Sequence, residues 1–156
     1  RAAQPEVVLA LTQKQGMQLL RAMHLVGLTH PLLTTELRQR LPAEAYVQHL
    51  GATELAAEAL FMAVEGPADY QLLDAIGNRA ALEMCARLRP KAAANLLWAF
   101  AKLHRRHDAF IDAMANRIAS GFGAEFSPEE ASKAREALLS LGSDHQAALQ
   151  ALERSK

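Results

Sequence analysis

Basic, amide and aromatic side chains recur at helical spacing in the middle of the chain. They are Lys91, Asn95, Trp98 and Lys102. Intervals of four, three and four residues place such side chains on one side of a helix. Ammonium and amide groups bind phosphate oxygens, and an indole ring can stack on a nucleobase. The pattern therefore indicates a surface that binds phosphate or an acidic partner, and the alternative interpretation is an ordinary solvated face.

Two further sets of polar residues follow within the segment HRRHD. The guanidinium groups of Arg105 and Arg106 are expected to reach freely from a turn and could pair bidentately with phosphate, although a basic surface loop would look the same. His104, His107 and Asp108 resemble part of a metal site. No further ligand stands at a fitting position, so we do not expect a metal.

No arrangement of residues in the sequence indicates catalysis. The chain has no glycine-rich phosphate loop, no nucleophile elbow and no HExxH segment. Its one cysteine, Cys85, excludes an internal disulfide and multi-cysteine metal sites, and we expect it to be a small core residue. We therefore predict a protein that is not an enzyme, with no cofactor and no small-molecule substrate.

The charge of the chain is unevenly distributed. The formal net charge is zero over 156 residues, which argues against the simplest kind of nucleic-acid protein. Between Asn78 and His107, however, seven Lys and Arg face one Glu, and the remainder of the chain is correspondingly acidic. The middle of the chain is thus a local basic block that could face a polyanion.

The residues that carry this chemistry lie on a pair of expected helices, from Arg89 to Ala119. Pro90 suits a first helical turn, and no breaker follows before Leu103. A second helix is expected from Ala109, because Phe110, Ile111, Met114 and Ile118 share one side. A pair of this length cannot bury its apolar stripe alone, so neighbouring copies are expected.

Copies of this pair are present in the sequence. The segment from Phe110 to Arg117 resembles one that begins at Leu72 and another that begins at Ala148, equally far before and after it, and Arg154 is the apparent counterpart of Arg117. An earlier copy with Leu33, Leu37 and Arg40 is one residue off this period. Asp74 and Asp112 occupy equivalent places, which indicates a structural reason for their recurrence.

The first helices of the copies can be aligned on hydroxyl or capping positions. The alignment starts at Thr12, Thr53, Arg89 and Ser127 and gives the second repeat a shorter turn. We predict an all-α fold, an α-solenoid of about four helix-turn-helix repeats of roughly 38 residues. One domain, 1–156, would contain repeats at approximately 12–41, 53–82, 89–119 and 127–154.

The alignment separates a packing face from a contact face. The positions four, seven, ten and eleven places after each start are mostly small or apolar and should pack: Gly16, Leu19, Ala22, Met23; Ala57, Leu60, Ala63, Val64; Ala93, Leu96, Ala99, Phe100; Ala131, Ala134, Ala137, Leu138. The contact face lies about a third of a turn away. In the first repeat it holds Lys14, Gln18 and Arg21, which we also take as candidate contacts with RNA or a partner.

The connecting segments carry their own signals. Residues 42–51 are expected to hold a short helix with Tyr46 and Val47 inward, and residues 120–126 to break the helical run. Ser127 and Pro128 have the order of a helix start.

The last repeat has no polar capping helix beyond it, so we expect its end to be covered by further chain or by a partner. No apolar run reaches the roughly 18 to 20 residues that a membrane helix needs, and we predict no membrane insertion.

The third repeat resembles a known family. PKAAANLLWAFAKL, followed by a second helix ending in Asn-Arg, is similar to the octotricopeptide repeat, whose first helix usually carries leucine-tryptophan-alanine, here Leu97-Trp98-Ala99. Leu20-Arg21-Ala22, Phe61-Met62-Ala63 and Arg135-Glu136-Ala137 keep the alanine and lose the tryptophan. Because the motif places tryptophan beside small residues, packing between repeats is favoured for Trp98 over base stacking.

This resemblance implies a setting for the protein. Members of the family are organellar proteins that bind RNA or form part of a ribonucleoprotein such as the mitochondrial ribosome. The resemblance therefore implies a mitochondrial protein, or alternatively a chloroplast protein, whose partners are organellar rRNA or mRNA and neighbouring proteins of a large assembly. The sequence begins with Arg1 and not with Met, which is consistent with a removed targeting peptide or with a fragment. The alternative function is a protein-binding scaffold without RNA contact.

Overall fold

The structure is a computed structural model that describes residues 41–66 and 68–155, together with nine earlier positions: 12, 15, 16, 18, 19, 22, 23, 36 and 39. Over these residues every regular element is a helix and there is no strand, which confirms the all-α class. The chain divides into two compact units, 1–50 and 51–156. That residues 1–156 form one domain stays a prediction.

Among the described residues of the first unit, the short helix α4 spans Ala43–Val47. Tyr46 and Val47 are buried in it, as expected from the sequence. Further upstream, the Thr12 hydroxyl accepts a hydrogen bond from the Gln15 N–H at 3.4 Å, and the Thr12 N–H donates to the Gln15 side chain at 2.9 Å. Thr12 therefore sits at a helix start, and most of the predicted first repeat lies outside the described residues.

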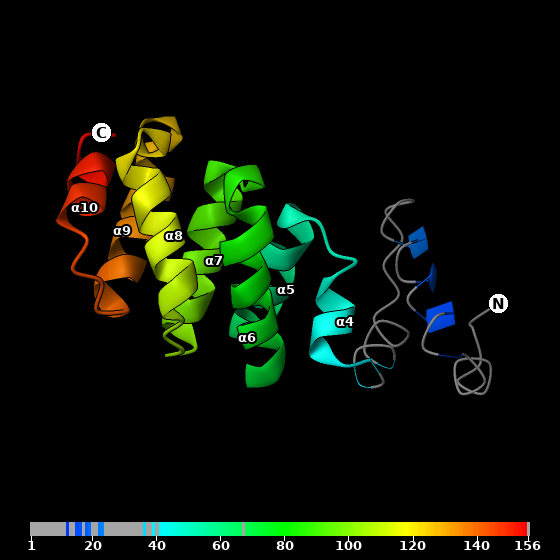
Figure 1. Cartoon of the computed structure of the whole chain (residues 1–156). Coiled ribbons are helices and arrows are strands. Elements are labelled where there is room, and N and C mark those ends of the chain that lie inside the picture. Colours follow the sequence, from blue (N-terminus) through cyan, green and yellow to red (C-terminus); the bar gives the residue numbers. More distant parts are fainter. Residues whose placement is uncertain are drawn as a thin grey trace. The chain divides into compact units, whose positions relative to one another are not determined.

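The second unit consists of three helical hairpins (Figure 1). Their bounds are α5 Ala52–Val64 and α6 Tyr70–Arg79, α7 Pro90–Lys102 and α8 Asp108–Ala119, and α9 Pro128–Ser140 and α10 Gln146–Glu153. The first helices form one layer in which α7 packs against both α5 and α9. The second helices form the other layer, in which α8 contacts α6 and α10.

The three hairpins repeat with one constant period. The capping residues of the first helices, Gly51, Arg89 and Ser127, are evenly spaced along the chain, and those of the second helices, Asp69, His107 and His145, have the same spacing. The alignment of the second repeat on Thr53 is therefore wrong by two residues, and its turn is not shorter. Thr53 has a good side chain for a cap, but the helix begins at Ala52, after a Gly51 that makes no side-chain capping bond.

The packing face agrees with this corrected alignment in α7 and α9 but only in part in α5, where Leu55 and Met62 are buried and Glu58 and Phe61 are not. In α7 and α9 all eight predicted packing residues are buried. In α5 the buried residues are Leu55, Ala56, Ala59 and Met62, whereas Ala57 is exposed and Val64 is 61% exposed. The predicted packing face of α5 is wrong for that reason. The counterpart of Trp98 in α5 is Leu60, so the segment that corresponds to Leu97-Trp98-Ala99 is Ala59-Leu60-Phe61 and not Phe61-Met62-Ala63.

Short helical segments connect the hairpins and are held by the second helices. A π-helical turn over Ala80–Met84 and a 3-10 turn over Cys85–Arg87 lead to α7, and a 3-10 turn over Phe122–Glu125 leads to α9. The Arg117 guanidinium donates to the Cys85 and Leu88 carbonyls. Ser155 follows Arg117 by one repeat period and donates to the Gly123 carbonyl at 2.6 Å. Ser155 and not Arg154 is therefore the counterpart of Arg117.

The last hairpin differs from the one before it on one side. In α7 the residues Ala94, Leu97 and Ala101 are buried. Their counterparts in α9 are Ser132, Arg135 and Leu139, which are exposed or half-exposed, and Arg135 forms an ion pair with Glu153 of α10 at 2.7 Å. This side of α9 is therefore more polar than the corresponding side of α7. No helix among the described residues has the length and apolar content to cross a membrane.

Candidate functional site

The structure places the four predicted contact residues of the third repeat along one side of α7. Lys91 and Lys102 are exposed near its two ends, and Asn95 and Trp98 are half-buried between them. The stretch from Lys91 to Lys102 corresponds to about 16 Å along a helix axis. Neither lysine forms an ion pair with any described residue. Both ammonium groups are thus available to an anionic ligand.

A further lysine, which the sequence did not reveal as part of this face, reaches it from α9. The Lys133 ammonium donates to the Asn95 side-chain oxygen at 2.6 Å and lies 4.9 Å from the centre of the Trp98 ring. Asn95 and Lys133 occupy the same position in successive hairpins, 38 residues apart. That equivalence was the available signal, because equal positions of adjacent helices in a regular stack are neighbours.

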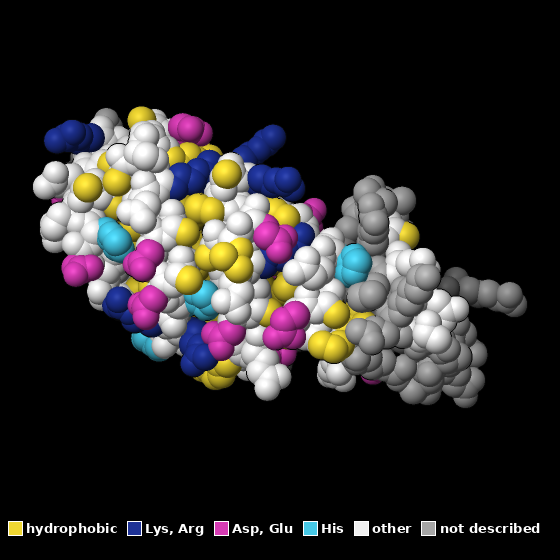
Figure 2. Space-filling view, viewed as in Figure 1, with side chains coloured by type: hydrophobic (Ala, Val, Ile, Leu, Met, Phe, Trp, Pro, Cys, Tyr) yellow, Lys and Arg dark blue, Asp and Glu magenta, His cyan; other side chains and the backbone are white. Residues whose placement is uncertain are grey.

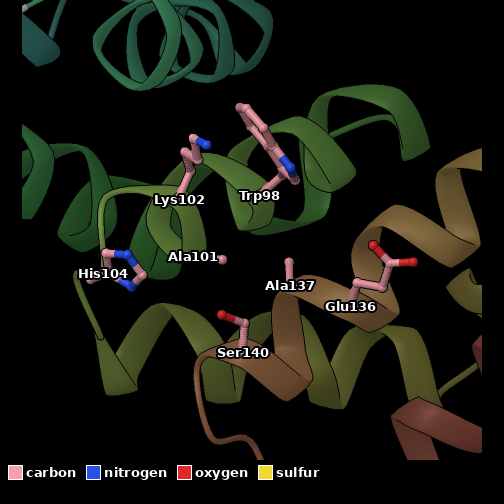
Figure 3. A pocket seen from close by; sticks show the side chains of 7 residues that line it. All are labelled: Trp98, Ala101, Lys102, His104, Glu136, Ala137 and Ser140. Carbon is pink, nitrogen blue, oxygen red and sulfur yellow. The ribbon is translucent and has the colours of Figure 1, made fainter.

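A groove lies between α7 and α9 on this face (Figure 3). It encloses about 310 Å³ and is lined by Trp98, Ala101, Lys102, His104, Glu136, Ala137 and Ser140. Trp98 and Lys102 come from α7 and point away from α9 in this view, and Glu136 and Ser140 line the other side of the groove from α9 (Figure 3). The two alanines leave the space open, because longer side chains there would fill it. The groove combines one aromatic ring with one cation, one imidazole, one hydroxyl and one carboxylate.

The two arginines of the turn between α7 and α8 are not free. Arg105 donates two hydrogen bonds to the Asp74 carboxylate, at 2.8 and 2.5 Å. This hydrogen bond and the arginine's charge lower the pKa of Asp74, although partial burial opposes them. The expectation of freely reaching guanidinium groups is wrong for Arg105, because the stack brings α6 of the preceding hairpin beside this turn.

Arg106 is held by the following hairpin. Its Nε donates to Asp108 at 2.6 Å, and its Nη1 donates to the carbonyl oxygens of Leu141 and Gly142 at 2.7 and 2.8 Å. These carbonyls terminate α9. The expectation of a free guanidinium group is therefore wrong here too, and the geometry gives both arginines a role in joining hairpins.

The histidines of the same region act separately. Nδ1 of His107 accepts a hydrogen bond from the Phe110 N–H at 3.3 Å, and Nε2 lies 3.1 Å from the Asn78 side-chain oxygen. His104, whose φ is +51°, lines the groove instead.

Cys85 is half-buried, and burial raises the pKa of its thiol. A raised pKa disfavours the thiolate that nucleophilic chemistry would need.

Two exposed arginines precede α7 and were not singled out from the sequence. Arg87 ends the 3-10 turn before α7, and Arg89 is the capping residue of α7. Neither forms an ion pair with a described residue. In Figure 2, Lys and Arg side chains project from the upper edge of the second unit, where Figure 1 places the segment after α6. The excess of basic residues between Asn78 and His107 was the signal that could have identified them.

The candidates from the first repeat are mostly outside the described residues. Lys14 and Arg21 lie there, whereas Gln18 is described, exposed and helical. The contact face of the first repeat therefore stays a prediction.

Comparisons of the chain with protein-family models, with curated proteins and with solved structures find no match.

Proposed function

We propose that this chain is a non-catalytic helical-repeat protein that binds RNA through the α7 face. The observation that carries the proposal is the row of Lys91, Asn95, Trp98 and Lys102, whose two ammonium groups, near the ends of the helix, pair with no described carboxylate. Exposed cations supply the sequence-independent part of RNA affinity, and an aromatic ring between them is typical of sites for single strands. The scaffold we propose is a solenoid of about four repeats.

The side chains of this face suggest how each would contribute. Lys91 and Lys102 bind phosphate oxygens by charge. Asn95 uses its oxygen for Lys133, so its amide NH₂ is left to donate to a phosphate or a base. Trp98 carries the Lys133 ammonium over its ring and also lines the groove. A base that enters the groove would therefore meet the indole beside Lys102 and opposite Glu136.

The proposed setting follows from the resemblance of the third repeat to octotricopeptide repeats. We place the protein in the mitochondrion, with the chloroplast as the alternative, as a structural component of a ribonucleoprotein such as the mitochondrial ribosome. Pairing of Arg105 and Arg106 within the protein leaves a small number of free cations in the described part of this region. A small number suits a protein that contacts RNA inside a larger assembly.

The experiment is equilibrium binding of a fluorescent single-stranded RNA to the full chain as salt rises from about 50 to about 200 mM. We expect affinity to fall with salt, with a slope of roughly one for each phosphate contact. Lys91→Glu with Lys102→Glu should weaken binding and lower the slope by about two. An RNA affinity that changes neither with salt nor in this double variant would refute the proposal. Lys133 stays unchanged in both proteins, so the Asn95 contact is preserved.

A protein-binding scaffold without RNA contact is the second candidate, and exposed apolar side chains favour it. Large apolar residues at the surface include Phe61, Val64, Tyr70, Leu82 and Leu139, and Leu82 is 83% exposed. Scattered apolar residues are common on protein surfaces, so we rank this candidate below RNA binding. Partner capture that persists at high salt and is lost in Leu82→Ser would support it.

A further inference from the structure

We infer that the RNA strand runs along the axis of α7 rather than across the successive hairpins. The inference rests on the proposed function and adds the path of the ligand. It follows from where the exposed cations without an ion pair lie in the described hairpins. Four of the five, Arg87, Arg89, Lys91 and Lys102, lie in or just before α7, and the fifth is Arg154 at the end of α10. The four are called the cationic row, which runs along the chain from the 3-10 turn before α7 to the last residue of α7.

The positions of Arg89 and Lys91 are unfavourable for the helix itself, whereas Lys102 lies in the last turn, where a cation stabilises the helix. The N-terminal end of a helix carries partial positive charge and is stabilised by acidic side chains. Helix α9 follows this rule, with Glu129 and Glu130 in its first turn and a capping box on Ser127. Helix α7 has no acidic residue in its first turn and no side-chain cap, and Arg89 and Lys91 flank Pro90 there. Helix stability therefore does not account for these cations, whereas an anionic ligand does.

A path across the hairpins would meet different surroundings. On α5 the four positions that correspond to the α7 contact residues are uncharged: Thr53, Ala57, Leu60 and Val64. On α9 the corresponding positions are Glu129, Lys133, Glu136 and Ser140. A strand leaving α7 toward α9 would face two carboxylates and one lysine that already bonds Asn95. Toward α5 it would find no cation at these positions.

The path along α7 also sets a length for the bound segment. Thirteen residues in α7 correspond to about 20 Å at about 1.5 Å per residue. At a stacked spacing of about 3.4 Å, this covers about six nucleotides. Three neighbouring first helices, whose axes lie about 8 to 10 Å apart, span a similar distance. RNA length therefore does not separate the two paths, whereas charge-reversing variants do.

The test compares the full chain with three variants, using uridine oligonucleotides of about four to about sixteen nucleotides. In Arg87→Glu with Arg89→Glu we expect at least about a tenfold loss of affinity and a salt slope lower by about two. Arg154→Glu is the matched control, because it reverses an exposed cation at the end of α10 and should change affinity less than twofold. In Glu129→Gln, whose side chain does not line the groove, we expect little change. Thermal melting checks that each variant is folded.

The results also distinguish the inference from the proposed function. Loss of affinity in the Arg87 and Arg89 variant, with little change in Glu129→Gln, supports the path along α7. Unchanged affinity in the Arg87 and Arg89 variant, with tighter binding in Glu129→Gln, overturns it while RNA binding stands. Absence of salt-dependent binding by the unaltered chain overturns the proposed function itself. An acidic peptide that competes for Arg87 and Arg89 where RNA does not would assign the row to a protein partner and overturn both.

Discussion

Gly77 of α6 leaves the space in which the His107 ring lies. A Cβ atom at residue 77 would stand 2.6 Å from Cδ2 of His107, which is closer than the two atoms can approach. The ring bonds Asn78 on one edge and the N-terminus of α8 on the other. One hairpin later the counterpart of Gly77 is Ala115, and His145 bonds Asp112 at 2.9 Å instead. The histidine thus bonds Asn78 where the preceding helix has glycine, and Asp112 where it has alanine.

Gly77→Ala should therefore destabilise the protein, against the usual effect of this change. In an open helix interior, alanine would add up to about 1 kcal/mol of stability. Here the new methyl group displaces the His107 ring from both of its hydrogen bonds, and we expect a net loss of about 1 to 2 kcal/mol. Urea unfolding measures the change.

A double-mutant cycle isolates the cause of that loss. In a His107→Ala background the ring is absent, so Gly77→Ala should be neutral or stabilising. Equal destabilisation in both backgrounds would show that the Gly77 backbone, and not contact with His107, accounts for the effect.

The ion pair between Asp74 and Arg105 should make stability depend on acid pH. The hydrogen bond from Arg105 lowers the pKa of Asp74 below its ordinary value of 3.8. A carboxyl group whose pKa is lower in the folded state contributes stability that is present above the unfolded pKa. That contribution is lost as the pH falls through the folded pKa.

We expect Asp74→Asn to lower the melting temperature near about pH 7 and to have little effect near about pH 2. Both groups are partly exposed, so the loss at neutral pH should be small and should shrink further in high salt. Asp112→Asn provides the matched change one hairpin later, where the partner is His145. A loss from Asp74→Asn that is the same at both pH values would contradict the electrostatic cause.

The helices of the second unit could be predicted where their ends carry chemical signals. Pro90 marks the start of α7, and the Ser127-Pro128 start with Glu130 forms the observed capping box. Helix α5 starts after Gly51 without any side-chain cap. The hydroxyl of Thr53, two residues later, therefore predicts a capping position that the structure does not have. Where the cap is only backbone geometry, the sequence carries no residue that marks the boundary.

The pairing of the basic turn could not be predicted from local spacing. Arg105 and Asp74 are 31 residues apart, and they meet because α8 packs against α6. The recurrence of Asp74 and Asp112 at the repeat period did contain the information. Each carboxylate faces the turn of the following hairpin, one toward Arg105 and the other toward His145. To predict the ion pair from this recurrence, one must know how neighbouring hairpins stack. Equivalent positions in the sequence do not give that arrangement.

Ala99 offers a direct test of how closely α7 is packed. It is fully buried, and its counterpart in α5 is Phe61, which is 45% exposed. A large side chain is thus accommodated at this position only where it reaches the surface. Ala99→Leu should overpack the core at a cost of about 1 to 3 kcal/mol. Ala57→Leu on the exposed side of α5 is the control, and we expect it to change stability by less than about 0.5 kcal/mol. Equal melting temperatures for the two variants would show that the packing of α7 is not as close as argued.

The polar residues on one side of α9 and α10 should keep copies of this chain from stacking end to end. Ser132, Arg135 and Glu153 stand where the preceding hairpin has Ala94, Leu97 and Ala115, all of them buried. Replacing the three polar residues with these apolar ones would create a face like the one on which the next hairpin normally packs. We expect the triple variant to self-associate with rising concentration, because an exposed apolar face of this kind is not stable in water. Sedimentation velocity measures the association.

The matched control places equally apolar residues on the other side of α9. Glu129→Ala, Glu136→Leu and Ser140→Ala lie on the contact face, where no described hairpin packs, and this variant should associate less. If the two triple variants associate equally, general surface hydrophobicity and not the stacking geometry drives association. If neither variant associates, the polar residues Ser132, Arg135 and Glu153 do not prevent stacking. That result would support the expectation that further chain or a partner covers this end.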